Sequence, residues 1–132
     1  MSDGVERPKD PDCDLCQAAK ITPWHHDDDV CWIAECELCA TPMVVWRSHG
    51  VDPPMDEKTY MHEQLGLVAL AEIGEFYIDD NMRNIPDHYH AHARPSNKGV
   101  PGFFGHHIVR PEGSPANRPR EEWRDAKWLY EE

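Results

Sequence analysis

The sequence predicts an α+β fold, in which short strands are followed by one long helix and then by a further strand. Three short stretches, residues 21–26, 30–35 and 42–47, have the apolar or alternating composition of strands. Over residues 57–77, apolar side chains recur at every third or fourth position, which predicts one buried helix face. Residues 88–94 then return to strict alternation, which is the period of a strand.

The 132-residue chain is long enough for one domain with one modest core. We expect residues 1–11 to form a disordered tail and residues 12–110 to form the domain. Residues 111–132 would then be a C-terminal extension with a short helix over residues 121–130. The polar N-terminus and the lack of any long apolar stretch predict a cytoplasmic protein that does not enter a membrane.

A polar turn at residues 27–29 separates the first two predicted strands, so we expect them to pair as a hairpin. The third strand is the most apolar and ends just before His49. Residues 51–54 contain two prolines, which exclude regular structure and predict a loop. A last strand is predicted over residues 103–109.

The long helix is predicted to begin near Asp56, where Glu57 adds negative charge at the favourable end of the helix dipole. Pro86 must end it, and the apolar pattern runs on as far as Met82. Its buried face is expected to carry Leu65, Val68, Ile73 and Phe76.

The stretch from His88 to Arg94 contains the candidate catalytic and phosphate-binding side chains. Alternation places Tyr89, Ala91 and Ala93 on a face towards the core. The opposite face then carries three imidazoles and a guanidinium, from His88, His90, His92 and Arg94. Imidazoles serve as nucleophiles, acids, bases and metal ligands near neutral pH, and arginine suits phosphate.

This stretch resembles the signature of the histidine-triad (HIT) superfamily, three histidines at every second residue, and the order of elements agrees. Residues 42–49 also look like that family's central strand, which ends in a basic residue and a histidine. The resemblance implies an α+β fold with an antiparallel sheet and often a homodimer. It implies hydrolysis or transfer of nucleotidyl groups at an α-phosphate, with a nucleotide or another small phosphate ester as substrate. His90 would be the nucleophile, and His88 and His92 would bind phosphate and assist proton transfer.

Two departures from the family pattern concern substrate binding. Family members usually carry a segment with Gly and Ser or Gln before the triad, where this chain has residues 83–87. Arg83, Asn84 and Arg94 could substitute as phosphate partners. The family's ribose-binding acid lies between the second and third strands, where this chain has residues 35–39.

Four of the five cysteines form two C-x-x-C pairs, which predict a structural zinc site. In the predicted hairpin, the pair Cys13/Cys16 precedes the first strand and the pair Cys36/Cys39 follows the second. Both pairs would meet at the open end of the hairpin, so zinc would staple it. Zinc-containing relatives offer another arrangement, in which the site would use Cys13, Cys16, His49 and His88.

Three functions remain open at this point: a HIT-like hydrolase or transferase, a non-catalytic zinc-stabilised binding module, and an enzyme whose triad holds a catalytic metal. The net charge of −12 disfavours non-specific binding to nucleic acids or anionic membranes.

The fifth cysteine, Cys31, is expected to be a buried strand residue without a function. The pairs His25/His26 and His106/His107 are expected mainly at the surface.

Overall fold

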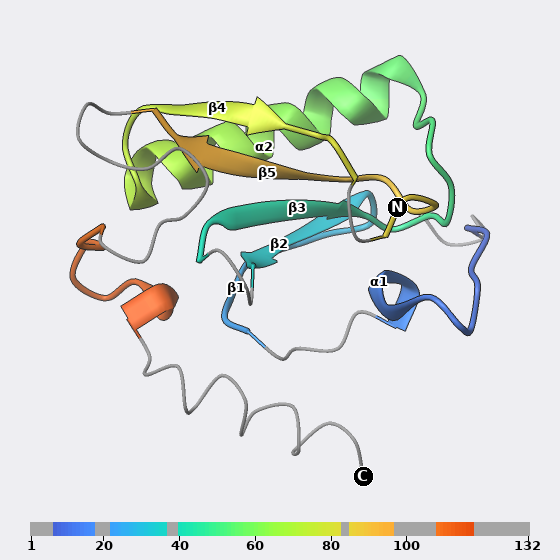
Figure 1. The fold of residues 1–132 in the computed structure, drawn as a ribbon, viewed down its shortest axis with the longest axis horizontal. Coiled ribbons are helices and arrows are strands. Elements are labelled where there is room, and N and C mark those ends of the chain that lie inside the picture. Colours follow the sequence, from blue (N-terminus) through green and yellow to red (C-terminus); the bar gives the residue numbers. More distant parts are fainter. Residues whose placement is uncertain (1–6, 18–21, 37–39, 83–84, 97–107, 118–132) are drawn as a thin grey trace, which may run out of the picture.

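The computed structural model describes residues 7–17, 22–36, 40–82, 85–96 and 108–117. It has the predicted α+β class, with one five-stranded antiparallel sheet and one main helix (Figure 1). The sheet order is β1-β2-β3-β5-β4. The helix predicted over residues 121–130 and most of the strand predicted over residues 103–109 lie outside the described residues.

The first three strands, the long helix and the triad strand follow in the predicted order, and β4, which was not predicted, lies between the last two. The strands are β1 (Trp24–Asp27), β2 (Cys31–Glu35), β3 (Pro42–Trp46), β4 (Phe76–Asp79) and β5 (His90–Pro95). The long helix is α2 (Met55–Glu72), and two short helices are α1 (Asp14–Gln17) and η1 (Pro115–Asn117). No helix in the described part of the chain is long and apolar enough to span a membrane.

The predicted hairpin of β1 and β2 is confirmed, with Trp24 opposite Ala34. Asp28 closes its turn by accepting the backbone N–H groups of Val30 and Cys31 at 2.8 and 2.9 Å. The side chain of Tyr60, on α2, donates to the same carboxylate. Asp28 therefore ties the hairpin turn to the helix.

Asp28 should make the fold sensitive to acid. Burial would raise the pKa of Asp28, but hydrogen bonds from Tyr60, Cys31 N–H, His26 and Val30 N–H lower it to about 2. Its contribution to stability is therefore present above the pKa of the unfolded chain and lost as pH falls towards 2.

We expect Asp28→Asn to reduce the difference in unfolding free energy between pH 7 and pH 2.5 by on the order of 1 kcal/mol, discounted for partial exposure. Denaturant titrations at the two pH values measure this difference. Asp29→Asn, an exposed neighbour in the same turn, is the matched control. An Asp28→Asn protein with the pH dependence of the wild type would contradict the assignment.

The helix ends earlier than predicted. Gly74 has a φ of 82°, a left-handed conformation that only glycine adopts without strain, and its N–H donates to Ala69 O at 3.0 Å. The chain then reverses into β4, so Phe76 and the residues after it form an edge strand instead of a helix. Leu65 and Ile73 are buried as predicted, whereas Val68 and Phe76 are only partly buried against the core.

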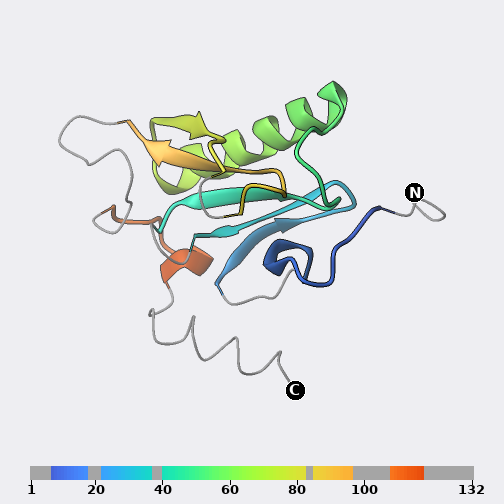
Figure 2. The same ribbon diagram turned by 45° about the vertical axis from the view of Figure 1, so that its right-hand side comes forward.

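The two faces of the sheet carry two apolar clusters. The larger lies under α2 and contains Met61, Leu65, Ala69 and, from the segment at β5, Tyr89, Ala91 and Ala93. The smaller lies on the opposite face and consists of Trp32, Ala34 and Val45, with Leu15, Trp24 and Met43 packed against it. Figure 2 shows α2 on one side of the sheet and α1 on the other.

Segments near both ends of the described chain pack onto the main elements. Residues 7–9, in the part of the chain expected to form a disordered tail, contact the segment that follows β3 and also α2. At the other end, Arg110 lies in a buried ion-pair network. Its guanidinium donates to Glu35 at 2.8 Å and to Glu72 at 2.9 Å, and also to Ala40 O at 2.8 Å.

Arg110→Met should destabilise the fold by about 3–5 kcal/mol, because it removes the cation from two buried carboxylates while keeping most of the side-chain volume. The side chains of Glu35 and Glu72 are only 0% and 8% exposed, so water cannot replace the arginine. Denaturant unfolding at pH 7 measures the change. Asp27→Asn, which breaks the exposed pair with Arg47, should cost under about 1 kcal/mol. Equal costs for the two variants would contradict this ranking.

Candidate functional site

The predicted division of the triad segment into two faces is confirmed. Tyr89, Ala91 and Ala93 are buried in the cluster under α2. The strand itself begins at His90, two residues later than predicted, so His88 lies just before it. We call the opposite face of β5, with its neighbours on β3 and β4, the histidine face.

A hydrogen bond to the backbone two residues earlier holds the ring of His90. Its Nδ1 lies 2.8 Å from the carbonyl oxygen of His88. Because a carbonyl only accepts, Nδ1 carries the proton and donates, and Nε2 keeps a free lone pair. Burial lowers the pKa of His90, although the hydrogen bond to His88 acts in the opposite direction. The neutral form of the ring is therefore favoured at pH 7, with the proton on Nδ1 and a lone pair on Nε2.

Charged groups continue the histidine face beyond His90. The ring of His92 lies edge-on to that of His90, with centroids 5.8 Å apart. Arg94 donates from Nε to Asp79 at 2.7 Å, and Asp79 lies opposite His92 in the ladder between β4 and β5. The predicted phosphate partner Arg94 is thus on the expected face, in an ion pair with a residue of the neighbouring strand.

The other side of His90 is apolar. Val45 on β3 is its partner in the ladder, and Trp32 on β2 is in turn the partner of Val45. The rings of Trp24 and Trp32 stack in parallel, with centroids 4.6 Å apart, and Leu15 of α1 packs against the same cluster. The ring of His90 therefore lies between an apolar cluster on one side and charged side chains on the other.

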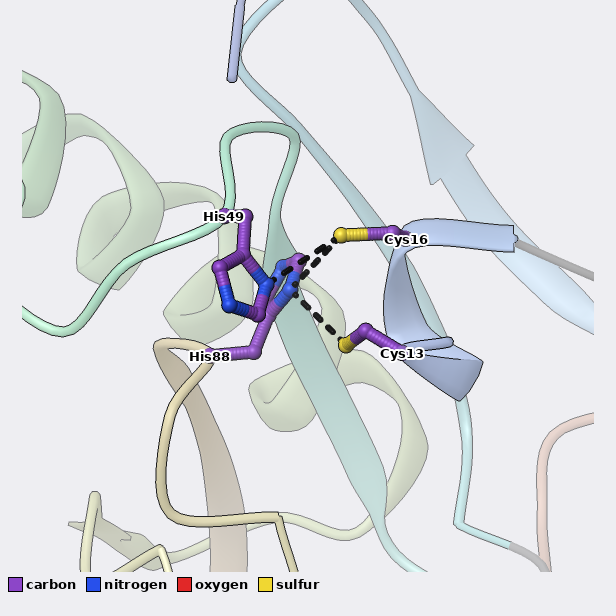
Figure 3. A group of neighbouring side chains, drawn as sticks. All are labelled: Cys13, Cys16, His49 and His88. Carbon is purple, nitrogen blue, oxygen red and sulfur yellow. Dashed lines mark hydrogen bonds between the residues drawn. The ribbon is translucent and has the colours of Figure 1, made fainter. Parts of the chain in front are cut away.

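A second group of side chains adjoins the triad. Cys13, Cys16, His49 and His88 bring two sulfurs and two ring nitrogens within 4.8 Å of one another (Figure 3). Sγ of Cys16 lies 3.4 Å from Nδ1 of His49 and 3.4 Å from Nδ1 of His88. Sγ of Cys13 lies 3.4 Å from the same nitrogen of His88. We call these four residues the cysteine–histidine group.

In both histidines of the group, the ring nitrogen that points away from the sulfurs lies near oxygen atoms. Nε2 of His88 lies 2.7 Å from the carbonyl oxygen of Trp46, so Nε2 donates and Nδ1 presents its lone pair to the sulfurs. Nε2 of His49 faces the carboxylates of Asp87 and Asp10 at 3.6 and 3.9 Å. Metal-binding histidines in proteins are oriented in this way by an oxygen on the second ring nitrogen.

The group has the chemistry and the dimensions of a zinc site. Two cysteines and two histidines are a common donor set for structural zinc. A tetrahedral zinc with usual bond lengths separates sulfur and nitrogen ligands by roughly 3.6 Å, close to the 3.4 Å between the sulfurs and Nδ1 atoms here. The backbone N–H of Asp10 also donates to Sγ of Cys16 at 3.4 Å and helps to hold this sulfur in place. These residues can hold a metal ion.

The structure does not place Cys36 with Cys13 and Cys16, in contrast to the predicted four-cysteine staple. Cys36 follows Glu35, which pairs with Pro42 at the first residue of β3. The cysteine–histidine group lies at the last residue of β3, where His88 contacts Trp46. The hairpin was predicted correctly, but Cys36 lies near the first residue of β3 and the cysteine–histidine group near its last residue, so Cys36 is separated from Cys13 and Cys16.

Several predicted site residues lie outside the described residues, namely Arg83, Asn84, Cys39, His106 and His107. Cys31 is fully buried, and burial raises its pKa to about 12, as expected for a core thiol. His25 and His26 contact carboxylates instead of solvent alone: Nε2 of His25 lies 2.7 Å from Glu35 and Nε2 of His26 lies 2.6 Å from Asp28.

Sequence reasoning missed the residues that orient the site. Asp79 was not predicted to lie on a strand, because the apolar pattern of the helix over residues 57–77 runs on as far as Met82. Asp10 and Asp87 are acidic residues near a C-x-x-C pair and a triad histidine, which is a weak signal in so acidic a chain. The Trp46 carbonyl carries no sequence signal, because every residue has one.

No protein-family model, no curated protein and no solved structure matches this chain, so the assignment of a function depends on the geometry of the site.

Proposed function

We propose that the protein is a HIT-like hydrolase or transferase that acts on nucleotidyl groups through a covalent intermediate on His90. The observation that supports this best is the 2.8 Å hydrogen bond from Nδ1 of His90 to the His88 carbonyl. It fixes the tautomer that a nitrogen nucleophile needs, on a ring that burial keeps neutral.

In the proposed reaction, Nε2 of His90 attacks the α-phosphorus and forms a nitrogen–phosphorus bond. The bond to the leaving group breaks, and that group departs with its electron pair and takes a proton from His92. Water or an acceptor alcohol then attacks phosphorus, the bond to Nε2 breaks, and His92 takes up the proton of the attacking group. Atoms and charge balance without a further reactant.

His88 takes a different role from the one that the resemblance implies. One ring nitrogen faces the two sulfurs and the other donates to Trp46, so both are engaged. We therefore assign His88 to holding the cysteine–histidine group and to orienting His90 through its carbonyl. The proton transfers are left to His92, which is only partly buried and lies edge-on to the nucleophile.

We also propose that the cysteine–histidine group binds one structural zinc ion. Zinc would stabilise the segment of Cys13 and Cys16 against β3 and would be held by neutral histidine nitrogens and thiolates. This arrangement weighs against a catalytic metal held by all three triad histidines, because Nδ1 of His88 already faces the sulfurs. Among the described residues, the three triad rings do not form a group of metal ligands.

Turnover and binding assays test the enzymatic proposal directly. The full chain is incubated with adenosine 5′-phosphoramidate, adenylylated amines and dinucleoside polyphosphates, and nucleoside monophosphate is measured. Thermal shift with nucleoside monophosphates reports binding, since a ligand of the folded state raises its apparent stability. Release of the monophosphate from any of these substrates supports the proposal. Binding without cleavage favours the non-catalytic binding module, and the absence of both rejects nucleotide recognition.

A further inference from the structure

The segment of residues 7–17 lies as a strap across the end of β3. Pro8 O accepts the N–H of His49 at 2.7 Å, and Nζ of Lys9 donates to Arg47 O at 3.3 Å. Within the strap, Cys13 N–H donates to Asp10 O at 3.0 Å. The strap thus follows the segment that carries one of the two histidines of the cysteine–histidine group.

An ion pair fastens the beginning of the strap. Both terminal nitrogens of Arg7 donate to the carboxylate of Glu57, at 3.1 and 3.2 Å, and Nη1 also donates to Ser48 Oγ at 2.9 Å. Glu57 accepts a third hydrogen bond, from Nε1 of Trp46 at 2.8 Å. The two side chains are 17% and 25% exposed, so this pair is better shielded than an ordinary surface pair.

The far end of the strap covers part of the histidine face. Leu15 of α1 packs against the cluster of Trp32, Ala34 and Val45, and Val45 is the ladder partner of His90. Helix α1 has only four residues, which is too short for it to be stable without tertiary contacts. The position of Leu15 beside His90 therefore depends on the contacts that hold the strap in place, the Arg7–Glu57 ion pair and the cysteine–histidine group.

We propose that the strap has two coupled fastenings, a metal ion in the cysteine–histidine group and the Arg7–Glu57 ion pair, so that metal loading controls the covering of the histidine face. Arg7 and Glu57 are then positioning residues for metal binding, although neither contacts the metal. When the metal leaves, Cys13 and Cys16 lose their connection to His49 and His88, and Leu15 is released from the floor beside His90. This inference rests on the proposed metal site and not on the proposed chemistry.

Coupling has a reciprocal consequence that can be measured. Arg7→Ala should weaken zinc binding by about fivefold, the effect of an ion pair of ordinary strength. The charge-exchanged Arg7→Glu/Glu57→Arg protein should recover part of this loss, which a general structural defect would not allow. Glu63→Gln, at an exposed position further along α2, should leave zinc affinity unchanged.

Hydrogen–deuterium exchange of the full chain gives the second measurement. Chelation of zinc should increase exchange in peptides covering residues 7–17, and leave the buried turn of α2 at Leu65 protected. The coupled strap is wrong, while the metal site stands, if the wild type binds zinc but chelation does not change exchange in residues 7–17 and Arg7→Ala does not change zinc affinity. If the wild type binds no zinc, the metal site and the strap are both wrong, and turnover assays still judge the proposed chemistry separately.

Discussion

Replacing His90 with asparagine should lower turnover of a cleaved nucleotidyl substrate by roughly 10⁴-fold to 10⁶-fold, the scale seen when a covalent nucleophile is removed. Asparagine has no nucleophilic nitrogen. Its side-chain amide can still donate to the His88 carbonyl, which accepts from His90 at 2.8 Å in the wild type. The change therefore removes the chemistry and keeps the hydrogen bond that organises the start of β5.

His92→Asn is the matched comparison. We assign proton transfer to His92, and general acid–base catalysis contributes about 10²-fold to 10⁴-fold. This variant should keep a measurable remainder, above all on substrates whose leaving group needs no proton. Steady-state rates at saturating substrate, circular dichroism and metal content of both variants complete the comparison. If His90→Asn turned over at the wild-type rate, or if His92→Asn lost more activity, His90 would not be the nucleophile.

The elements could be predicted where a single period governs the chain. Alternation separated His90 from Tyr89 and Ala91 correctly, because one face of β5 is packed against α2 and the other is not. The end of α2 was predicted too late, since Phe76 and Tyr77 follow Ile73 by three and four residues, which suits a helix, while Phe76 and Ile78 also alternate as in a strand. Only the left-handed backbone at Gly74 decides between the two.

The site could be predicted only in part, because the triad histidines are close in sequence whereas the residues of the cysteine–histidine group are far apart. The three triad histidines lie within five residues, so a local pattern is enough to place His90 and His92 together. The residues of the cysteine–histidine group come from three distant segments, and sequence spacing alone allowed Cys13 and Cys16 either of two partner sets. Tertiary contacts distinguish the two sets in the structure: residues 7–9 contact residues 47, 49 and 57, which brings Cys13 and Cys16 to the end of β3 near His49.

We expect the purified protein to carry one zinc ion per chain and to lose it in Cys16→Ala. Cys16 lies 3.4 Å from the ligand nitrogens of both histidines, so its loss opens the centre of the group. Cys36→Ala should keep the metal, because the structure does not place Cys36 in the group. Native mass spectrometry and elemental analysis measure the ratio of zinc to protein for each variant.

Metal loading should also raise the free energy of unfolding, since a ligand that binds only the folded chain stabilises it. At a free zinc concentration a thousand times the dissociation constant, the gain is about 4 kcal/mol, and chelation should remove it from the wild type and from Cys36→Ala. Cys16→Ala should unfold at the same denaturant concentration with and without chelator. If Cys36→Ala instead lost the zinc and this gain, the four-cysteine arrangement would be correct, and His49 and His88 would not be ligands. His88→Ala keeps the backbone carbonyl that accepts from His90, so it should lose the zinc, and its turnover would show whether loss of the metal also impairs His90.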